Sequence, residues 1–294
     1  MRLSIVVIFH DMRREAARTL HSLSAAYQQG VSEADYEVIA VDNASAEPLP
    51  ESLATGAGRN FRLIRHETAS VSPVEAVNLG VAAARGAAVA IIVDGARMAS
   101  PGLVGTTLQA LSLAAQPVIY ARSWHLGPDV QNRSILEGYD QAREDALLAE
   151  ANWQDDGYRL FDISTLAQSS AGGFFGPVPS EFSWVALPRE LFETVGGFDA
   201  RFTSPGGGLV NQHFRNILLA RPEVSLVQVL GEGVFHQIHG GVATNVPMKQ
   251  HPIGLYRQEY AGITGADFAV LPVAVSAQTH LGNLSEPARR FLQG

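Results

Sequence analysis

Short apolar runs alternate with amphipathic stretches through the first 122 residues, and this alternation restricts the fold more than any other feature. Five runs are rich in β-branched residues and have the length of strands buried on both faces: 3–8, 36–41, 61–65, 87–93 and 117–121. Between two of them, Val74, Val77, Val81 and Ala84 recur at helical spacing. The pattern predicts an α/β fold with a Rossmann-like, mostly parallel sheet and helices on both faces.

The regular pattern stops near residue 123 and returns near residue 181. The stretch 124–180 contains a charged helical segment and then Gly- and Ser-rich sequence, so we expect a partly mobile insertion on the acceptor side of any site. Strand and helix patterns then continue, with a strand expected from Val224 to Leu230. We predict one domain over 1–245, with halves 1–122 and 123–245, and a C-terminal extension over 246–294 packed on it.

Composition and charge argue against several classes of protein. The net charge of −8 disfavours general affinity for nucleic acid, and the absence of cysteine excludes disulfides, zinc–thiolate sites and cysteine nucleophiles. The N-terminal apolar run is too short for a signal peptide, and the run at 86–93 is far shorter than the ~20 residues of a membrane span. We therefore expect a cytoplasmic protein without a transmembrane segment.

Polar clusters follow three of the expected strands. They are Phe9-His10-Asp11, the segment 42–45 (Asp-Asn-Ala-Ser), and Asp94-Gly95-Ala96. Each alone is typical of a turn, but ligands of parallel α/β sheets bind beyond the carboxyl ends of strands, so together they indicate a binding site. The first strand is followed by neither GxGxxG nor GxxxxGK[ST], which disfavours a dinucleotide dehydrogenase or a P-loop enzyme.

Five short motifs resemble, in order, those of family 2 glycosyltransferases, which are nucleotide-sugar-dependent enzymes of the GT-A fold. The resemblance covers roughly residues 3–240. It is carried by residues 4–10 (SIVVIFH), 41–45 (VDNAS), 78–86 (NLG…ARG), Asp94 after an apolar strand, and 196–202 (GGFD.RF).

The resemblance implies roles for residues of this sequence. Asp42 and Asn43 would hydrogen-bond the nucleotide base, the backbone of Phe9 and His10 would flank it, and the Asn78 motif would belong to the same nucleotide-sugar half. Asp94 would be the first carboxylate of the family's DxD motif, which contacts ribose and a divalent metal. A hard cation such as Mg²⁺ or Mn²⁺ stabilises the diphosphate that leaves as the sugar bond breaks.

Two positions depart from the family pattern. The third DxD position is Ala96, which cannot bind a metal. The stretch 206–212 (GGGLVNQ) replaces the Glu-Asp pair that supplies the family's general base. Both departures raise the alternative that the domain binds its ligand without catalysing transfer.

Two histidines, His236 and His239, lie three residues apart after the last expected strand and offer partial compensation for Ala96. Several GT-A enzymes complete the metal shell with a histidine in this region, so we expect His236 or His239 to bind a metal together with Asp94. The alternative is that one histidine bonds to backbone and the other is solvated.

A transferase that inverts the sugar also needs a base within reach of the acceptor hydroxyl. The candidates are Glu181, Asp199 and Glu232, which lie nearest the acceptor-side motifs. Sequence reasoning does not rank them.

Aromatic residues gather in and beside the insertion: Trp124, Trp153, Phe174, Phe175, Phe182 and Trp184. Aromatic faces stack on sugar rings, which makes Trp124 and Trp184 candidates for the acceptor side, while core packing is the alternative.

The sequence thus predicts a bacterial-type glycosyltransferase of surface polysaccharide or glycan synthesis. It would move a sugar from a nucleoside-diphosphate-sugar to a saccharide or lipid-linked glycan acceptor, with Mn²⁺ or Mg²⁺ as cofactor. A catalytically degenerate domain that binds nucleotide-sugar or glycan is the alternative. A nucleotidyltransferase is disfavoured, because Arg13-Arg14 comes without the Gly-rich loop it would need.

Overall fold

A single ten-stranded sheet organises the chain in the computed structural model, which describes residues 1–274 and 277–293. The strands are β1 (Leu3–Phe9), β2 (Tyr36–Asn43), β3 (Phe61–His66), β4 (Ala88–Ile92), β5 (Arg97–Ala99), β6 (Pro117–Leu126), β7 (Ser164–Leu166), β8 (Trp184–Pro188), β9 (Ser225–His236) and β10 (Gln278–Gly282). The order β10-β9-β6-β8-β4-β1-β2-β3 is mostly parallel, as the sequence predicted, with β8 antiparallel to both neighbours. Short β5 pairs with β9, and β7 pairs with β6.

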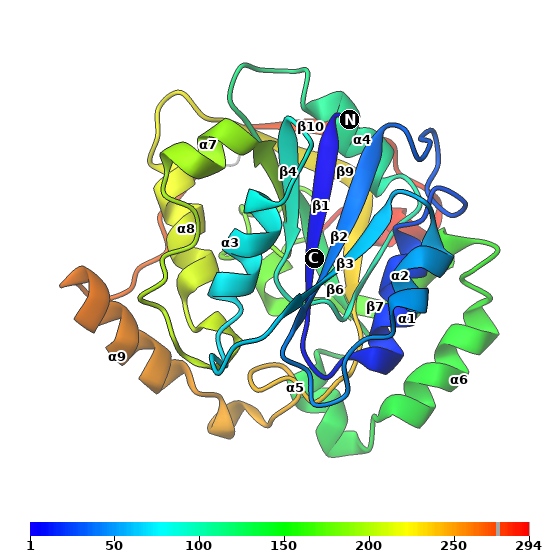
Figure 1. Ribbon diagram of the computed structural model, residues 1–294. Helices are drawn as coiled ribbons and strands as arrows, with labels where there is room; N and C mark the ends of the chain where they lie inside the picture. The colour runs from blue at the N-terminus through cyan, green and yellow to red at the C-terminus, as the bar shows by residue number, and fades with distance from the viewer. Residues whose placement is uncertain (275–276, 294) are drawn as a thin grey trace.

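Helices cover both faces of the sheet (Figure 1). They are α1 (Arg13–Ser22), α2 (Glu51–Ala57), α3 (Val74–Ala82), α4 (Leu103–Ala110), α5 (Gln131–Ser134), α6 (Gln141–Ala151), α7 (Arg189–Thr194), α8 (Val210–Leu219) and α9 (Ile253–Thr264). One core cluster joins α1, α2 and α4 to one face, and a second joins α3, α7 and α8 to the other. The central strands are buried on both sides, which explains their continuous apolar sequences.

Two strands extend five or more residues past the ends that the sequence predicts. β6 continues five residues past Ala121 to Leu126, and β9 continues past Leu230 to His236. Gly231 and Gly233 lie in the added part of β9, where the absence of a side chain allows other segments to approach closely. A Cβ on Gly233 would lie 2.1 Å from the Trp124 ring, and one on Gly231 would lie 1.9 Å from the carbonyl oxygen of Asn283.

A third, aromatic cluster centres on Trp124. Its ring packs against those of Phe161, Phe174, Phe235 and Phe291, with centroids 4.9–5.6 Å away. Phe291 comes from the C-terminal segment, and β10 of the same segment pairs in parallel with β9. Part of the stretch predicted as an extension therefore completes the sheet and the core.

Candidate functional site

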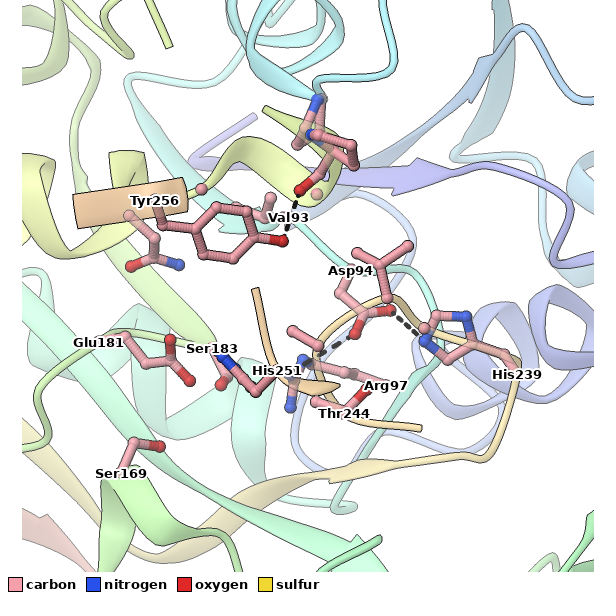
Figure 2. A pocket seen from close by; sticks show the side chains of 18 of the residues that line it. Val93, Asp94, Arg97, Ser169, Glu181, Ser183, His239, Thr244, His251 and Tyr256 are labelled. Atoms are coloured by element: carbon pink, nitrogen blue, oxygen red, sulfur yellow. Dashed lines mark hydrogen bonds and ion pairs between the residues drawn. The ribbon is translucent and has the colours of Figure 1, made fainter. Parts of the chain in front are cut away.

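A cavity of about 730 Å³ opens at the carboxyl ends of β1, β2 and β4 (Figure 2). The chain runs from β1 to β2 and β3 on one side and places β4 on the other, so the cavity lies where the strand order reverses. Ligands of open α/β sheets bind at this point. The strand ends contribute Ile8, His10, Asn43, Val93 and Asp94, and the segments 181–183, 205–212 and 239–253 supply much of the remaining wall.

Asp94 and His239 line this cavity, and His236 lies buried next to both of them. Asp94 follows β4, His236 ends β9, and His239 lies in the loop after it. His236 Nε2 is 2.7 Å from Asp94 Oδ2 and 3.2 Å from His239 Nε2, which is 3.5 Å from Asp94 Oδ1. The three residues form a group with one ligand atom each within reach of a common metal ion.

Gln131 at the start of α5 fixes the tautomer of His236. The Gln131 amide donates to the carbonyl oxygen of His236 at 2.9 Å and accepts from Asn245 Nδ2 at 2.8 Å, which sets its oxygen toward His236. His236 Nδ1 lies 2.7 Å from that oxygen and therefore carries the proton. The neutral ring then turns its unprotonated Nε2 toward Asp94, as metal-binding histidines do when their other nitrogen is held by a second partner.

Burial and neighbouring charge set the protonation of this group. Burial lowers the pKa of His236 to about 4 against the opposing effect of Asp94, so the ring is neutral at pH 7. Burial alone would raise the pKa of the Asp94 carboxyl, but a proton on either neighbouring histidine, His236 or His239, favours the carboxylate and moves that pKa well below its usual range. An ionised carboxylate and a neutral imidazole are the forms that bind metals.

The donor set fits a divalent cation. An octahedral ion with ligand distances of about 2.1–2.2 Å holds neighbouring ligand atoms about 3 Å apart, and the three separations above bracket that value. Two imidazoles and one carboxylate suit Mn²⁺ better than Mg²⁺. Three protein ligands leave half of an octahedral shell for a ligand or water.

Among the three candidate bases, Glu181 alone lines the cavity. Its Oε2 accepts a hydrogen bond from Gln212 Nε2 at 2.9 Å. Gln212 belongs to the stretch where the family resemblance leads one to expect a carboxylate pair, so Glu181 brings a carboxylate to that part of the cavity from another segment (Figure 2).

The other two carboxylates have structural partners outside the cavity. Asp199 forms a two-pronged ion pair with Arg201. Glu232 is buried and accepts from Ser100 Oγ, Gly102 N and Tyr158 Oη at 2.5, 3.0 and 2.7 Å. Neither carboxylate is placed to reach an acceptor in the cavity.

The residues expected at the nucleotide divide into two groups. His10 and Asn43 line the cavity, and His10 Nδ1 lies 2.8 Å from the carbonyl oxygen of Asn43. Phe9 is fully buried in the core, and Asn78 uses its amide to hold the backbone of Phe198. Neither Phe9 nor Asn78 lines the cavity with its side chain.

Asp42 is also absent from the cavity wall. Its buried carboxylate accepts from the backbone N–H groups of Ser45 and Leu49 at 3.2 and 2.7 Å and so shapes the loop after β2. Contact between Asp42 and a nucleotide base stays a prediction, and in this conformation the carboxylate is already engaged by its own loop.

The structure corrects the placement of the two tryptophans. Trp124 is the centre of the aromatic cluster, and Trp184 is buried with its Nε1 donating to Thr107 Oγ1 at 3.2 Å. Both side chains are fully covered, so neither offers a face to a sugar. Core packing, the alternative interpretation, holds for both.

Two cavity residues received no role of their own from the sequence, although His125 belongs to the run 124–129 that was expected on the acceptor side. His125 directly follows Trp124, and alternation along β6 turns it to the other face, toward the cavity. Arg97 directly follows the Asp94-Gly95-Ala96 cluster. Had β6 been predicted to reach Leu126, alternation along the strand would have placed the His125 and Trp124 side chains on opposite faces. No sequence pattern indicates the short strand β5, which carries Arg97.

The family model of glycosyl transferase family 2 matches residues 4–160, more than half of the chain. The chain belongs to glycosyl transferase family 2. No curated protein sequence matches it. The matched part contains β1–β6 and Asp94, whereas Glu181, His236 and His239 lie beyond it.

Solved structures share the GT-A fold of the family. Residues 1–349 of TarS from S. aureus superpose with a TM-score of 0.53 at 14% identity, over 81% of this chain and 60% of that one. The same TarS fragment in complex with UDP gives 0.54 at 13% identity, over 81% of this chain and 61% of that one. This family 2 chain therefore spans about three fifths of that fragment's length. Among the described residues, no helix is long and apolar enough to cross a membrane.

Proposed function

We propose that this chain transfers a sugar from a nucleoside-diphosphate-sugar to a saccharide or lipid-linked glycan acceptor, in surface polysaccharide or glycan synthesis. The observation that carries the proposal is the convergence of Asp94, His236 and His239 at the switch point of a family 2 sheet. These residues would hold a divalent cation. That cation would supply positive charge for the diphosphate as the sugar bond breaks.

The nucleoside would bind at the strand ends beside this cluster. His10 and Asn43 line the same cavity, at the end that β1 and β2 form. A donor with its base at His10 and Asn43 and its diphosphate at Asp94 would direct the sugar toward the wall formed by Glu181 and Gln212. UDP is the first donor nucleotide to test, because the TarS fragment was crystallised with it.

Glu181 is the base in this proposal if the transfer inverts. Its carboxylate lies on the cavity wall, and Gln212 orients it through the hydrogen bond to Oε2, which leaves Oε1 for an acceptor hydroxyl. The base takes the hydroxyl proton while the oxygen attacks the sugar, and a positioned base contributes about 10²–10⁴-fold.

Replacing Glu181 by Gln tests this function. We expect Glu181→Gln to bind the donor as the wild type does and to lose at least a hundredfold in turnover, measured as nucleoside diphosphate released with and without a panel of glycan acceptors. The control is Glu193→Gln, an exposed substitution on α7 away from the cavity. Equal turnover in Glu181→Gln and wild type would remove Glu181 from the reaction.

The second candidate function is binding without transfer. Ala96 and the carboxylate-free stretch 206–212 favour it, because both lie where family 2 enzymes carry acidic side chains. The same assay separates the two: donor binding by the wild type without release of nucleoside diphosphate, with every acceptor, supports the binding domain. A wild type that binds no nucleotide-sugar contradicts both.

A further inference from the structure

Arg97 is a buried cation in the wall of the cavity. It opens β5, which pairs antiparallel with β9 so that Arg97 lies opposite His236. Directly paired residues of antiparallel strands project to the same face, which sets Arg97 beside the proposed metal ligands. The residue is 8% exposed, and its side chain borders the cavity near Asp94 (Figure 2).

The hydrogen bonds of Arg97 leave most of its donors free. A guanidinium has five N–H donors. In the described part of the chain, Arg97 donates one hydrogen bond, from Nη1 to Ser123 Oγ at 2.8 Å. Its Nη2 lies 3.6 Å from Asp94 Oδ2, an ion pair beyond hydrogen-bond distance. A buried charge of this kind requires partners, and a cavity next to it is where an anionic ligand would supply them.

The charge of the cavity wall around Asp94 and Arg97 favours a diphosphate as the anionic ligand. The family's DxD motif would bring two carboxylates, but Ala96 removes one of them and Arg97 follows with a positive charge. Asp94 and Arg97 together are neutral, so this wall repels a diphosphate less than a pair of carboxylates would. Arginine also matches phosphate oxygens with two parallel N–H bonds, which a point charge cannot do.

We propose that Arg97 binds the diphosphate of the donor and supplies part of the positive charge that the metal would otherwise provide, since Ala96 leaves that metal with one ligand fewer. The inference rests on the proposed function, since the diphosphate is that of the nucleotide-sugar. It adds that diphosphate binding persists in part without a metal ion, held by Arg97.

Calorimetry with UDP, GDP, dTDP, the corresponding nucleosides and inorganic pyrophosphate tests the proposal, each in Mn²⁺ and in EDTA. We expect Arg97→Gln to weaken diphosphate and pyrophosphate binding at least tenfold in both conditions, and to leave nucleoside binding unchanged. The affinities of Arg97→Lys should lie between those of the wild type and Arg97→Gln, since lysine keeps the charge but cannot donate two parallel N–H bonds. Arg143→Gln, on the exposed side of α6, removes the same charge and should bind as the wild type.

Ser123→Ala keeps the test decisive if Arg97→Gln does not fold, because it removes the single hydrogen bond that orients the guanidinium. It should weaken pyrophosphate binding by a few-fold with the charge intact. Unchanged pyrophosphate affinity in Arg97→Gln, or in Ser123→Ala and Arg97→Lys together, would overturn the proposal.

The proposed function can fail separately from this inference. Arg97-dependent pyrophosphate binding without release of nucleoside diphosphate from any donor would leave the Arg97 site standing and remove the transferase. If Arg97→Gln leaves both turnover and diphosphate affinity unchanged, the transferase function stands and the Arg97 site is removed.

Discussion

At the scale of single residues, Glu232 is a carboxylate whose burial has a measurable consequence. Burial raises its pKa to about 7, and the hydrogen bonds from Ser100, Tyr158 and Gly102 oppose this rise only in part. In the unfolded chain the group has an ordinary pKa near 4.5. The folded state therefore binds more protons between these two values, and the free energy of unfolding falls as pH rises from about 4.5 to 7.

Glu232→Gln should remove this pH dependence, because the amide imitates the protonated acid and does not titrate. The shift corresponds to an order of 3 kcal/mol at about 1.4 kcal/mol per pH unit. Urea unfolding at pH 5 and pH 8 measures it: the wild type should lose more stability than the variant over this interval. Transfer activity should survive, since Glu232 lies outside the cavity. Parallel pH profiles for both proteins would show that the Glu232 pKa is not raised.

At the scale of elements, α5 holds the loop that carries His239. Asn245 Oδ1 accepts from the backbone N–H groups of His239, Gly240 and Gly241 at 2.9–3.0 Å, and its Nδ2 donates to Gln131. The side chain of Asn132 donates to the carbonyl oxygens of residues 243 and 246. The segment 124–180, expected to be a partly mobile insertion, thus ties down a second loop, and its own mobility stays a prediction.

Asn245→Ala should free three backbone amides and loosen the loop at 239–246. We expect hydrogen exchange there to accelerate about tenfold or more, while the amides of β6 and the aromatic cluster keep their protection. Asn245→Asp retains the accepting oxygen and should exchange nearly as the wild type does. Equal exchange in wild type and Asn245→Ala would mean that other contacts hold the loop.

Strands with a continuous apolar pattern could be predicted from the sequence. Strands, or parts of strands, whose conformation depends on contacts with other segments of the chain could not. β1, β2 and β4 are runs buried on both faces, so their residues alone define them. The edge strand β3 buries only Phe61, yet its apolar residues were enough to predict it. The end of β9 depends on Trp124 and Asn283, which approach Gly233 and Gly231 from elsewhere in the chain. β10 has only one buried residue, Gln278, and owes its conformation to pairing with β9.

At the scale of the whole molecule, the candidate site joins parts of the chain that the sequence separates widely. The predicted association of Asp94 with His236 or His239 spans more than 140 residues, and the structure places both histidines beside Asp94. The family resemblance indicated these positions, because the order of the motifs along the sequence can be recognised without knowing which residues are in contact. Gln131, Arg97 and Asn245 carry no motif. Only the assembled fold reveals that Arg97 lines the cavity, and that Gln131 and Asn245 hold His236 and the backbone of His239 beside it.

The assembled site predicts that metal and nucleotide bind cooperatively. The protein offers three ligand atoms, so the ion alone binds weakly, and diphosphate oxygens complete its shell when a nucleotide is present. Linkage requires each ligand to strengthen the other by the same factor. Thermal unfolding measures this: Mn²⁺ alone should raise the Tm slightly, UDP alone modestly, and both together by more than the sum. Saturation at a hundred times the Kd stabilises by about 2.7 kcal/mol. His239→Ala should abolish the excess but keep the shift caused by UDP alone, whereas additive shifts in the wild type would place the ion and the nucleotide at independent sites.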